Sequence, residues 1–95
     1  AHFAHYGPGK NYERHCDQAR GMTSRLFTFV IYLNESWEPK FGGELRIFKD
    51  ESTQVAEDIA PQPGRVVFFK SDEIWHQVQE SHFNRLSLTG WFRRP

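Results

Sequence analysis

This 95-residue sequence lacks several features, and each absence narrows what the protein can be. Its single cysteine, Cys16, excludes an internal disulfide and favours a reducing compartment, so we expect a cytoplasmic protein. No apolar run approaches the roughly 18 residues of a membrane-spanning helix, so we expect no membrane partner. Twelve basic and twelve acidic side chains give a formal net charge of zero, which argues against a nucleic-acid partner.

A helical repeat is also missing, and the fold prediction follows from that. No window places apolar residues at helical spacing, whereas aromatic residues make up 16% of the chain, a share typical of a strand-rich core. Short apolar or alternating segments, separated by glycine, proline and charged turns, predict about eight strands. These strands cover residues 2–6, 11–15, 25–34, 44–48, 54–59, 65–70, 75–79 and 84–92, and loops are expected at 17–24 and 35–43. We therefore predict a single all-β domain over residues 1–95, either a sandwich or a barrel.

The most apolar segments, 25–34 and 65–70, are expected to be buried strands. Alternation in 25–34 and 84–92 puts Tyr32 and Arg85 on faces opposite to strongly apolar ones. The opposite faces carry Phe27, Phe29, Ile31 and Leu33 in the first segment, and Leu86, Leu88 and Phe92 in the second. If Arg85 and Tyr32 point inward, this apolar surface is too large to face water. Because the chain opens at Ala1 within an expected strand, we predict a fragment of a longer protein whose helices, upstream of Ala1, cover the surface.

The stretch His15-Cys16-Asp17, taken with two later residues, predicts a metal site. His15 and Asp17 are two positions apart on an extended segment, so their side chains project to the same side. A second histidine, His76, is followed nine positions later by Arg85. Two imidazoles and one carboxylate form the facial triad of non-haem Fe(II) oxygenases, which leaves coordination positions open, and an arginine supplies a cationic fork for a carboxylate ligand. We read Cys16 as a spacer.

Together with the surrounding motifs, this arrangement resembles the Fe(II)- and 2-oxoglutarate-dependent dioxygenases. Within that family it is most similar to the prolyl 4-hydroxylases of the oxygen-sensing type and their bacterial relatives. The likeness extends over nearly the whole chain and includes His5-Tyr6-Gly7-Pro8-Gly9, Tyr12, Ile31-Tyr32-Leu33-Asn34, the run from Gly42 to Phe48, and the run from Arg85 to Phe92. Collagen-type prolyl hydroxylases resemble the chain less, because they have lysine where this chain has Arg85. Nucleic-acid demethylases carry a second arginine six residues after the first, where this chain has Trp91.

The resemblance implies a double-stranded β-helix, or jelly roll, with iron at its open end. His15, Asp17 and His76 match the three iron ligands, and with Arg85 they form the implied catalytic set. Arg85 and Tyr32 match the pair that binds the distal carboxylate of 2-oxoglutarate. A guanidinium bonded in a bidentate fashion fixes the direction of that carboxylate, which a lysine cannot do.

The resemblance also implies the remaining pocket positions and the activity. Tyr6 and Thr89 match positions that line the 2-oxoglutarate pocket, and Tyr12 matches a position near the metal where a peptide enters. The implied activity is hydroxylation of a C–H bond with Fe(II), 2-oxoglutarate and O2, with ascorbate as a candidate reductant. The leading expectation is prolyl 4-hydroxylation of a protein or peptide substrate that bears proline.

Two alternatives stay open at this point. One is the same chemistry on another side chain or on a small molecule. The other is a non-catalytic metal-binding barrel that serves as an interaction module. An intact triad together with Arg85 argues against the second alternative, because an inert module needs neither.

Overall fold

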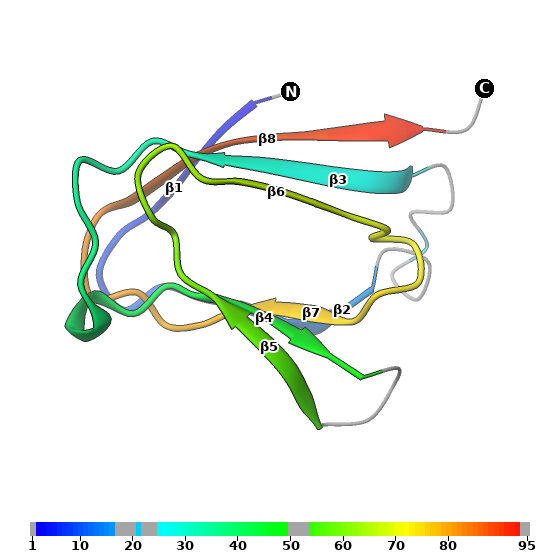
Figure 1. Cartoon of the computed structure of the whole chain (residues 1–95), viewed down its shortest axis with the longest axis horizontal. Coiled ribbons are helices and arrows are strands. Elements are labelled where there is room, and N and C mark those ends of the chain that lie inside the picture. The colour runs from blue at the N-terminus through cyan, green and yellow to red at the C-terminus, as the bar shows by residue number, and fades with distance from the viewer. Residues whose placement is uncertain (1, 17–20, 22–24, 50–53, 94–95) are drawn as a thin grey trace.

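The fold consists almost entirely of short strands (Figure 1). The computed structural model describes residues 2–16, 21, 25–49 and 54–93. In these ranges the elements are β1 (His2–Tyr6), β2 (Tyr12–His15), β3 (Arg25–Tyr32), the 3-10 helix η1 (Pro39–Phe41), β4 (Leu45–Phe48), β5 (Val55–Ile59), β6 (Val66–Phe69), β7 (His76–Val78) and β8 (Arg85–Arg93). Every predicted strand is therefore confirmed to within two residues at either end. The unexpected element is η1, a single turn that Pro39 begins.

The strands form two four-stranded antiparallel sheets that face each other. The upper sheet in Figure 1 has the order β1-β8-β3-β6, and the lower sheet has the order β2-β7-β4-β5. Successive strands cross from one sheet to the other, except that β4 and β5 are hydrogen-bonded neighbours in the lower sheet. Eight strands connected in this way form a jelly roll. The predicted double-stranded β-helix is confirmed.

The space between the sheets holds a core that is unusually polar. The buried hydrophobic residues among those described are Cys16, Val30, Tyr32, Leu45 and Phe48. Buried beside them are polar or charged side chains that include His15, Thr28, His76, Arg85 and Ser87. Buried polar groups need partners, and a buried charge is costly without one. This part of the interior is therefore suited to binding a polar ligand.

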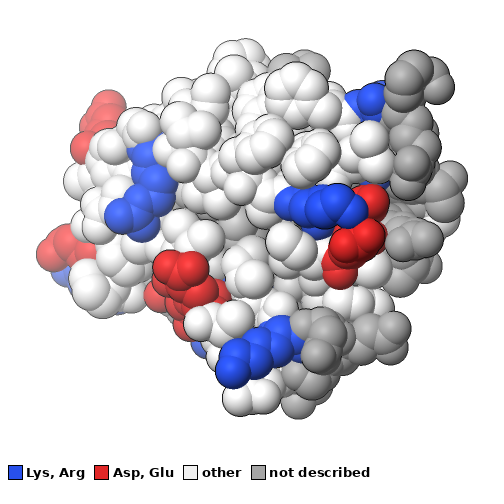
Figure 2. Space-filling view, turned by 45° about the vertical axis from the view of Figure 1, so that its right-hand side comes forward, with Lys and Arg blue, Asp and Glu red and all other residues white. Residues whose placement is uncertain are grey.

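The outer face of the upper sheet is apolar and exposed. Phe3, Val66, Phe68 and Phe92 are each more than half exposed, and Phe68 contacts the rings of both Phe27 and Phe92. Figure 2 shows that the upper middle of the visible surface carries few charged side chains. The expectation that 65–70 is a buried strand is wrong, because β6 lies at the edge of the sheet and alternate residues face outward. The helices expected upstream of Ala1 stay a prediction.

No described helix is long and apolar enough to cross a bilayer.

Candidate active site

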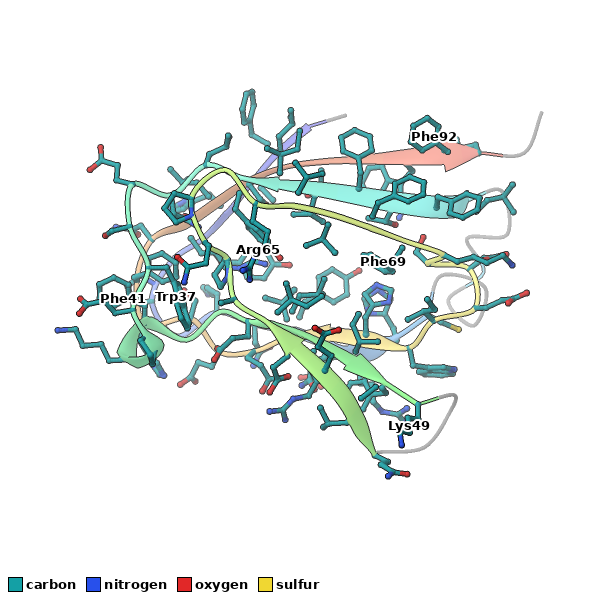
Figure 3. All side chains as sticks on the ribbon, in the orientation of Figure 1. Trp37, Phe41, Lys49, Arg65, Phe69 and Phe92 are labelled. Atoms are coloured by element: carbon teal, nitrogen blue, oxygen red, sulfur yellow. The ribbon has the colours of Figure 1, made fainter. Side chains whose placement is uncertain are left out.

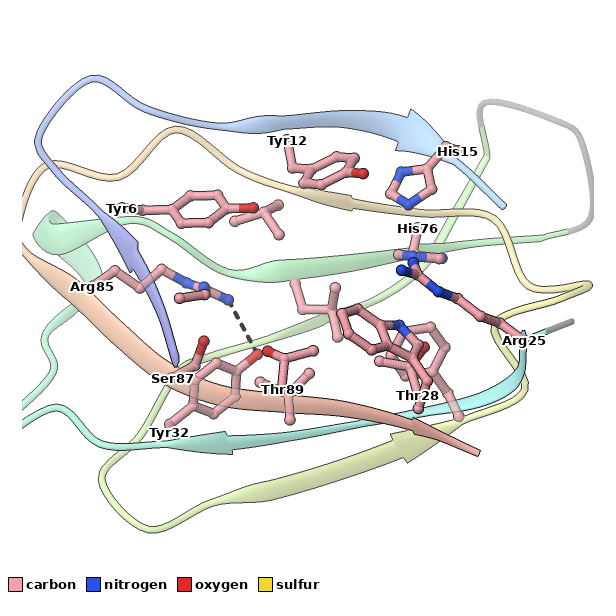
Figure 4. Close-up of a pocket in the computed structure, with 16 residues that line it drawn as sticks. Tyr6, Tyr12, His15, Arg25, Thr28, Tyr32, His76, Arg85, Ser87 and Thr89 are labelled. Atoms are coloured by element: carbon pink, nitrogen blue, oxygen red, sulfur yellow. Dashed lines mark hydrogen bonds between the residues drawn. The ribbon is translucent and has the colours of Figure 1, made fainter. Parts of the chain in front are cut away.

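A cavity of about 150 Å³ lies between the two sheets and is lined from both of them (Figure 4). Strands β2 and β7 of the lower sheet contribute His15 and His76, and strands β3 and β8 of the upper sheet contribute Tyr32 and Arg85. Tyr6, from β1, completes this set. Residues far apart in sequence therefore meet in one chamber.

The two histidines lie directly opposite each other on neighbouring strands. His15 pairs with His76 in the β2–β7 register, and their ring centroids are 4.2 Å apart. Both rings are held in the same way, because the Nδ1–H of His15 donates to the carbonyl of Glu13 and that of His76 to the carbonyl of Ile74, each at 2.8 Å. A donating Nδ1 leaves Nε2 deprotonated on each neutral ring, which is the form that ligates a metal. These two residues therefore fit an Fe(II) site.

The third predicted ligand, Asp17, lies outside the described residues. Within the described ranges no group of three His, Cys, Asp or Glu side chains could hold a metal. The described part of the chain thus supplies the two imidazoles of the predicted triad. The neighbouring Cys16 has a buried side chain and no disulfide.

Arg85 brings a buried positive charge into the cavity. Its side chain is only 3% exposed, and no carboxylate of a described residue pairs with it. Its Nε donates to the carbonyl of Gly43 at 2.8 Å, and its Nη2 donates to the hydroxyl of Tyr32 at 3.3 Å. The rings of Tyr6 and Tyr32 lie about equally far from its Cζ, at 5.2 and 5.1 Å. Because a buried charge without a counter-ion is costly, this arrangement indicates an anion-binding site.

Tyr32 is placed to donate a hydrogen bond to such an anion. Burial raises the pKa of Tyr32, although the positive charge of Arg85 partly offsets the effect, so the hydroxyl stays protonated at neutral pH. Its oxygen already accepts from Arg85, which leaves the O–H proton available for a carboxylate oxygen. Burial likewise raises the pKa of Tyr6, again against the charge of Arg85. At the Arg85 end, the cavity therefore combines a buried cation with neutral phenol groups.

These pKa shifts predict a loss of stability at alkaline pH. Because folding raises the pKa of both tyrosines, their contribution is constant below the unfolded value of about 10 and is lost as pH rises through the folded values. We expect the free energy of unfolding, measured by urea titration between about pH 9 and pH 11, to fall with pH. In Tyr32→Phe the free energy of unfolding should fall less steeply with pH. An equal slope in the variant would contradict this explanation.

The remaining predicted residues also line the cavity or adjoin its histidines. Thr89 faces the cavity from β8, opposite Val30 of β3. Tyr12 lies on β2 and stacks on the His15 ring, with centroids 4.4 Å apart. The structure thus brings together every described residue that the sequence nominated for the site.

The lining residues that the sequence did not nominate include the polar side chains of Arg25, Thr28 and Ser87. The guanidinium of Arg25 lies 3.9 Å from the centroid of the Trp91 ring, and Figure 4 shows Arg25 beside His76 and far from Arg85. Simple alternation would put Arg25 on the outer face with Phe27. An irregularity in the β3–β8 register between these residues lets Arg25 face the cavity instead. Thr28 and Ser87 could have been found, since they share faces with Tyr32 and Arg85.

Comparison with known sequences identifies the family. The family model of the 2OG-Fe(II) oxygenase superfamily matches residues 1–93. The chain belongs to the 2OG-Fe(II) oxygenase superfamily. Among curated members, mouse prolyl hydroxylase EGLN3 is 41% identical over 88 residues, which cover 90% of this chain and 36% of the relative. Human Egl nine homolog 1 is also 41% identical over 88 residues, covering 90% of this chain and 20% of the relative. This chain therefore spans about a third or less of the length of these relatives.

Solved structures of prolyl hydroxylases share the fold of this chain. A prolyl-4-hydroxylase from Pseudomonas putida superposes with a TM-score of 0.86 at 46% identity, covering 99% of this chain and 50% of the other. A Trichoplax adhaerens prolyl hydroxylase was solved with a peptide fragment of the hypoxia inducible factor oxygen degradation domain. It superposes with a TM-score of 0.82 at 29% identity, and the match covers 96% of this chain and 41% of the other. The jelly roll described above is thus shared with prolyl hydroxylases.

Proposed function

We propose that this oxygenase is a prolyl 4-hydroxylase of a protein substrate that uses Fe(II), 2-oxoglutarate and O2. The observation that carries the proposal is the buried Arg85 guanidinium, with no described carboxylate beside it, in the same chamber as His15 and His76. When bound, the iron and 2-oxoglutarate supply oxidative chemistry that hydroxylates a C–H bond and releases succinate and CO2. We include ascorbate as the reductant that keeps the metal ferrous, and a cytoplasmic location because Cys16 is a free thiol.

The side chains of this chain bind and orient the reactants. His15, His76 and the proposed third ligand Asp17 would hold the metal and leave open positions for the 2-oxo acid and dioxygen. Arg85 would fix the distal carboxylate, and Tyr32 would donate its hydroxyl proton to the same group. Burial of both side chains excludes water, which strengthens these charge-assisted bonds.

The proposed substrate is a peptide that reaches the metal from the end of the cavity where Arg25 lies. Figure 4 shows Arg85 and Arg25 at opposite ends of the drawn cavity, with His76 close to Arg25. A carboxylate at Arg85 would therefore leave the other end for the substrate. The similarity to prolyl hydroxylases, including the one solved with a peptide, supports proline as the target.

The test uses proline-containing peptides and their proline-to-alanine counterparts. We expect 2-oxoglutarate to be converted to succinate, and mass spectrometry to find one added oxygen atom on proline only. Oxygen added to another residue or to a small molecule would replace the prolyl assignment with the same chemistry on another target. Absence of succinate under all conditions would indicate a non-catalytic metal-binding barrel.

A further inference from the structure

We infer that Gly43 and Trp37 are positioning residues for Arg85, and that they restrict which N–H groups of its guanidinium bind the distal carboxylate of the cosubstrate. The inference rests on the proposed function and deepens it. Neither residue lines the cavity, so the effect passes through Arg85. Both residues lie at the ends of one turn, from Trp37 to Gly43, called here the glycine turn.

One edge of the guanidinium is already occupied. A guanidinium can bind a carboxylate through Nε and one Nη, or through both Nη groups. In this protein the Nε–H of Arg85 donates to the carbonyl of Gly43 at 2.8 Å, and both groups are buried. One Nη2–H is directed at Tyr32. The N–H groups that remain are on Nη1 and Nη2, so the carboxylate is bound end-on.

Only glycine fits where this carbonyl lies. Gly43 has a φ of +75°, and a Cβ built there would lie 2.9 Å from Cδ of Arg85 and 3.3 Å from Cε1 of Phe83. A side chain would therefore push directly against Arg85 in a backbone conformation that L-residues rarely adopt. The absence of a side chain allows the backbone to approach the guanidinium.

Hydrogen bonds hold the glycine turn against the segment that leads into β8. Gly43 N donates to the carbonyl of Glu80 at 3.1 Å, and His82 N donates to the carbonyl of Phe41 at 2.7 Å. The rings of Phe41 and Phe83 stack with centroids 5.1 Å apart. Both ends of the Gly43–Arg85 hydrogen bond are therefore anchored in one unit, at the end of the molecule where Figure 3 shows Trp37 and Phe41.

Trp37 determines the direction of the peptide that precedes Gly43. Its indole Nε1–H donates to the carbonyl of Gly42 at 2.8 Å. Gly42 also has a positive φ, of 66°. Because glycine has no Cβ, sterics restrict the orientation of this peptide less than at any other residue. The other side of this peptide is held by the bond from Gly43 N to the Glu80 carbonyl, so loss of the indole donor removes one of two restraints and would loosen the position of the Gly43 carbonyl beside Arg85.

The test measures binding rather than turnover. Trp37→Phe keeps an aromatic ring and removes the donor. Calorimetry on the Mn(II)-loaded protein compares 2-oxoglutarate with 2-oxopentanoate, which has the same carbon chain but no distal carboxylate. Because one hydrogen bond is at stake, we expect 2-oxoglutarate affinity to fall about three- to tenfold while 2-oxopentanoate affinity is unchanged. Gly43→Ala should lower 2-oxoglutarate affinity further. If Gly43→Ala does not fold, the Trp37→Phe result alone decides whether the positioning role holds.

Trp75→Phe is the matched control, because Trp75 packs against Arg14 and does not line the cavity. It should leave the ratio of the two affinities unchanged. If Trp37→Phe weakens both acids equally, or neither, the positioning role is overturned while the proposed function stands. If the wild-type protein shows no preference for the distal carboxylate, the proposed function is overturned and this inference with it.

Discussion

Replacing His76 by alanine is expected to abolish metal binding and 2-oxoglutarate turnover together. His76 lies opposite His15 in the β2–β7 register, and its ring is held by the carbonyl of Ile74, so its loss removes one of the two imidazoles that the described residues supply. Loss of residues that merely support ligands costs 10- to 100-fold in metal affinity, so loss of a ligand should cost at least roughly 100-fold. Mn(II) titration followed by electron paramagnetic resonance measures the affinity, and succinate release measures the turnover.

His82→Ala is the matched control for this experiment. The His82 side chain is more than half exposed and faces Glu80 rather than the cavity. The control should bind metal and turn over cosubstrate like the wild type. Circular dichroism shows whether each variant is folded. A folded His76→Ala protein with normal metal affinity would refute the ligand assignment.

Replacing Arg85 by lysine should separate cosubstrate binding from metal binding. Lysine keeps a positive charge, but it cannot bond to Gly43, to Tyr32 and to both oxygens of a carboxylate at once. A hydrogen bond to a charged group contributes about 1.5–3 kcal/mol, so the 2-oxoglutarate dissociation constant should rise by about 10- to 100-fold. Metal affinity should not change, because Figure 4 shows Arg85 at the other end of the cavity from His15 and His76. Equilibrium binding to the Mn(II) form measures both quantities.

Arg46→Lys provides the same substitution at a surface site. Arg46 forms a bidentate ion pair with Asp58 on the lower sheet, where both side chains are partly exposed. Exposed pairs of this kind contribute little, and the site is not part of the cavity. We therefore expect normal cosubstrate affinity in this control. Unchanged affinity in Arg85→Lys as well would remove Arg85 from the proposed carboxylate site.

Much of the fold could be predicted because each strand carries a local signal. The alternation along residues 84–92 assigned Arg85 and Leu86 to opposite faces, and the structure has Arg85 buried and Leu86 exposed. The prediction for 65–70 failed because an unbroken apolar run does not say whether a strand is central or at an edge. Val66 and Phe68 lie on the outward side of an edge strand.

The site could be predicted in its parts but not in its assembly. The spacing of His15 and Asp17, with His76 and Arg85 later, nominated the chemistry. Which residues face each other depends on strand register, and register is set by contacts between distant segments that no local pattern encodes. Two features depend on such distant contacts and could not be predicted. One is the register irregularity that lets Arg25 face the cavity, and the other is the hydrogen bond from Arg85 to the Gly43 carbonyl.

The exposed aromatic face of the upper sheet has a practical consequence for all these measurements. Phe3, Phe68 and Phe92 offer a wide hydrophobic surface on which two copies could adhere face to face. Such self-association depends on protein concentration. In ligand titrations of this 95-residue chain it would mimic cooperative binding. Sedimentation at each working concentration should therefore accompany every binding curve.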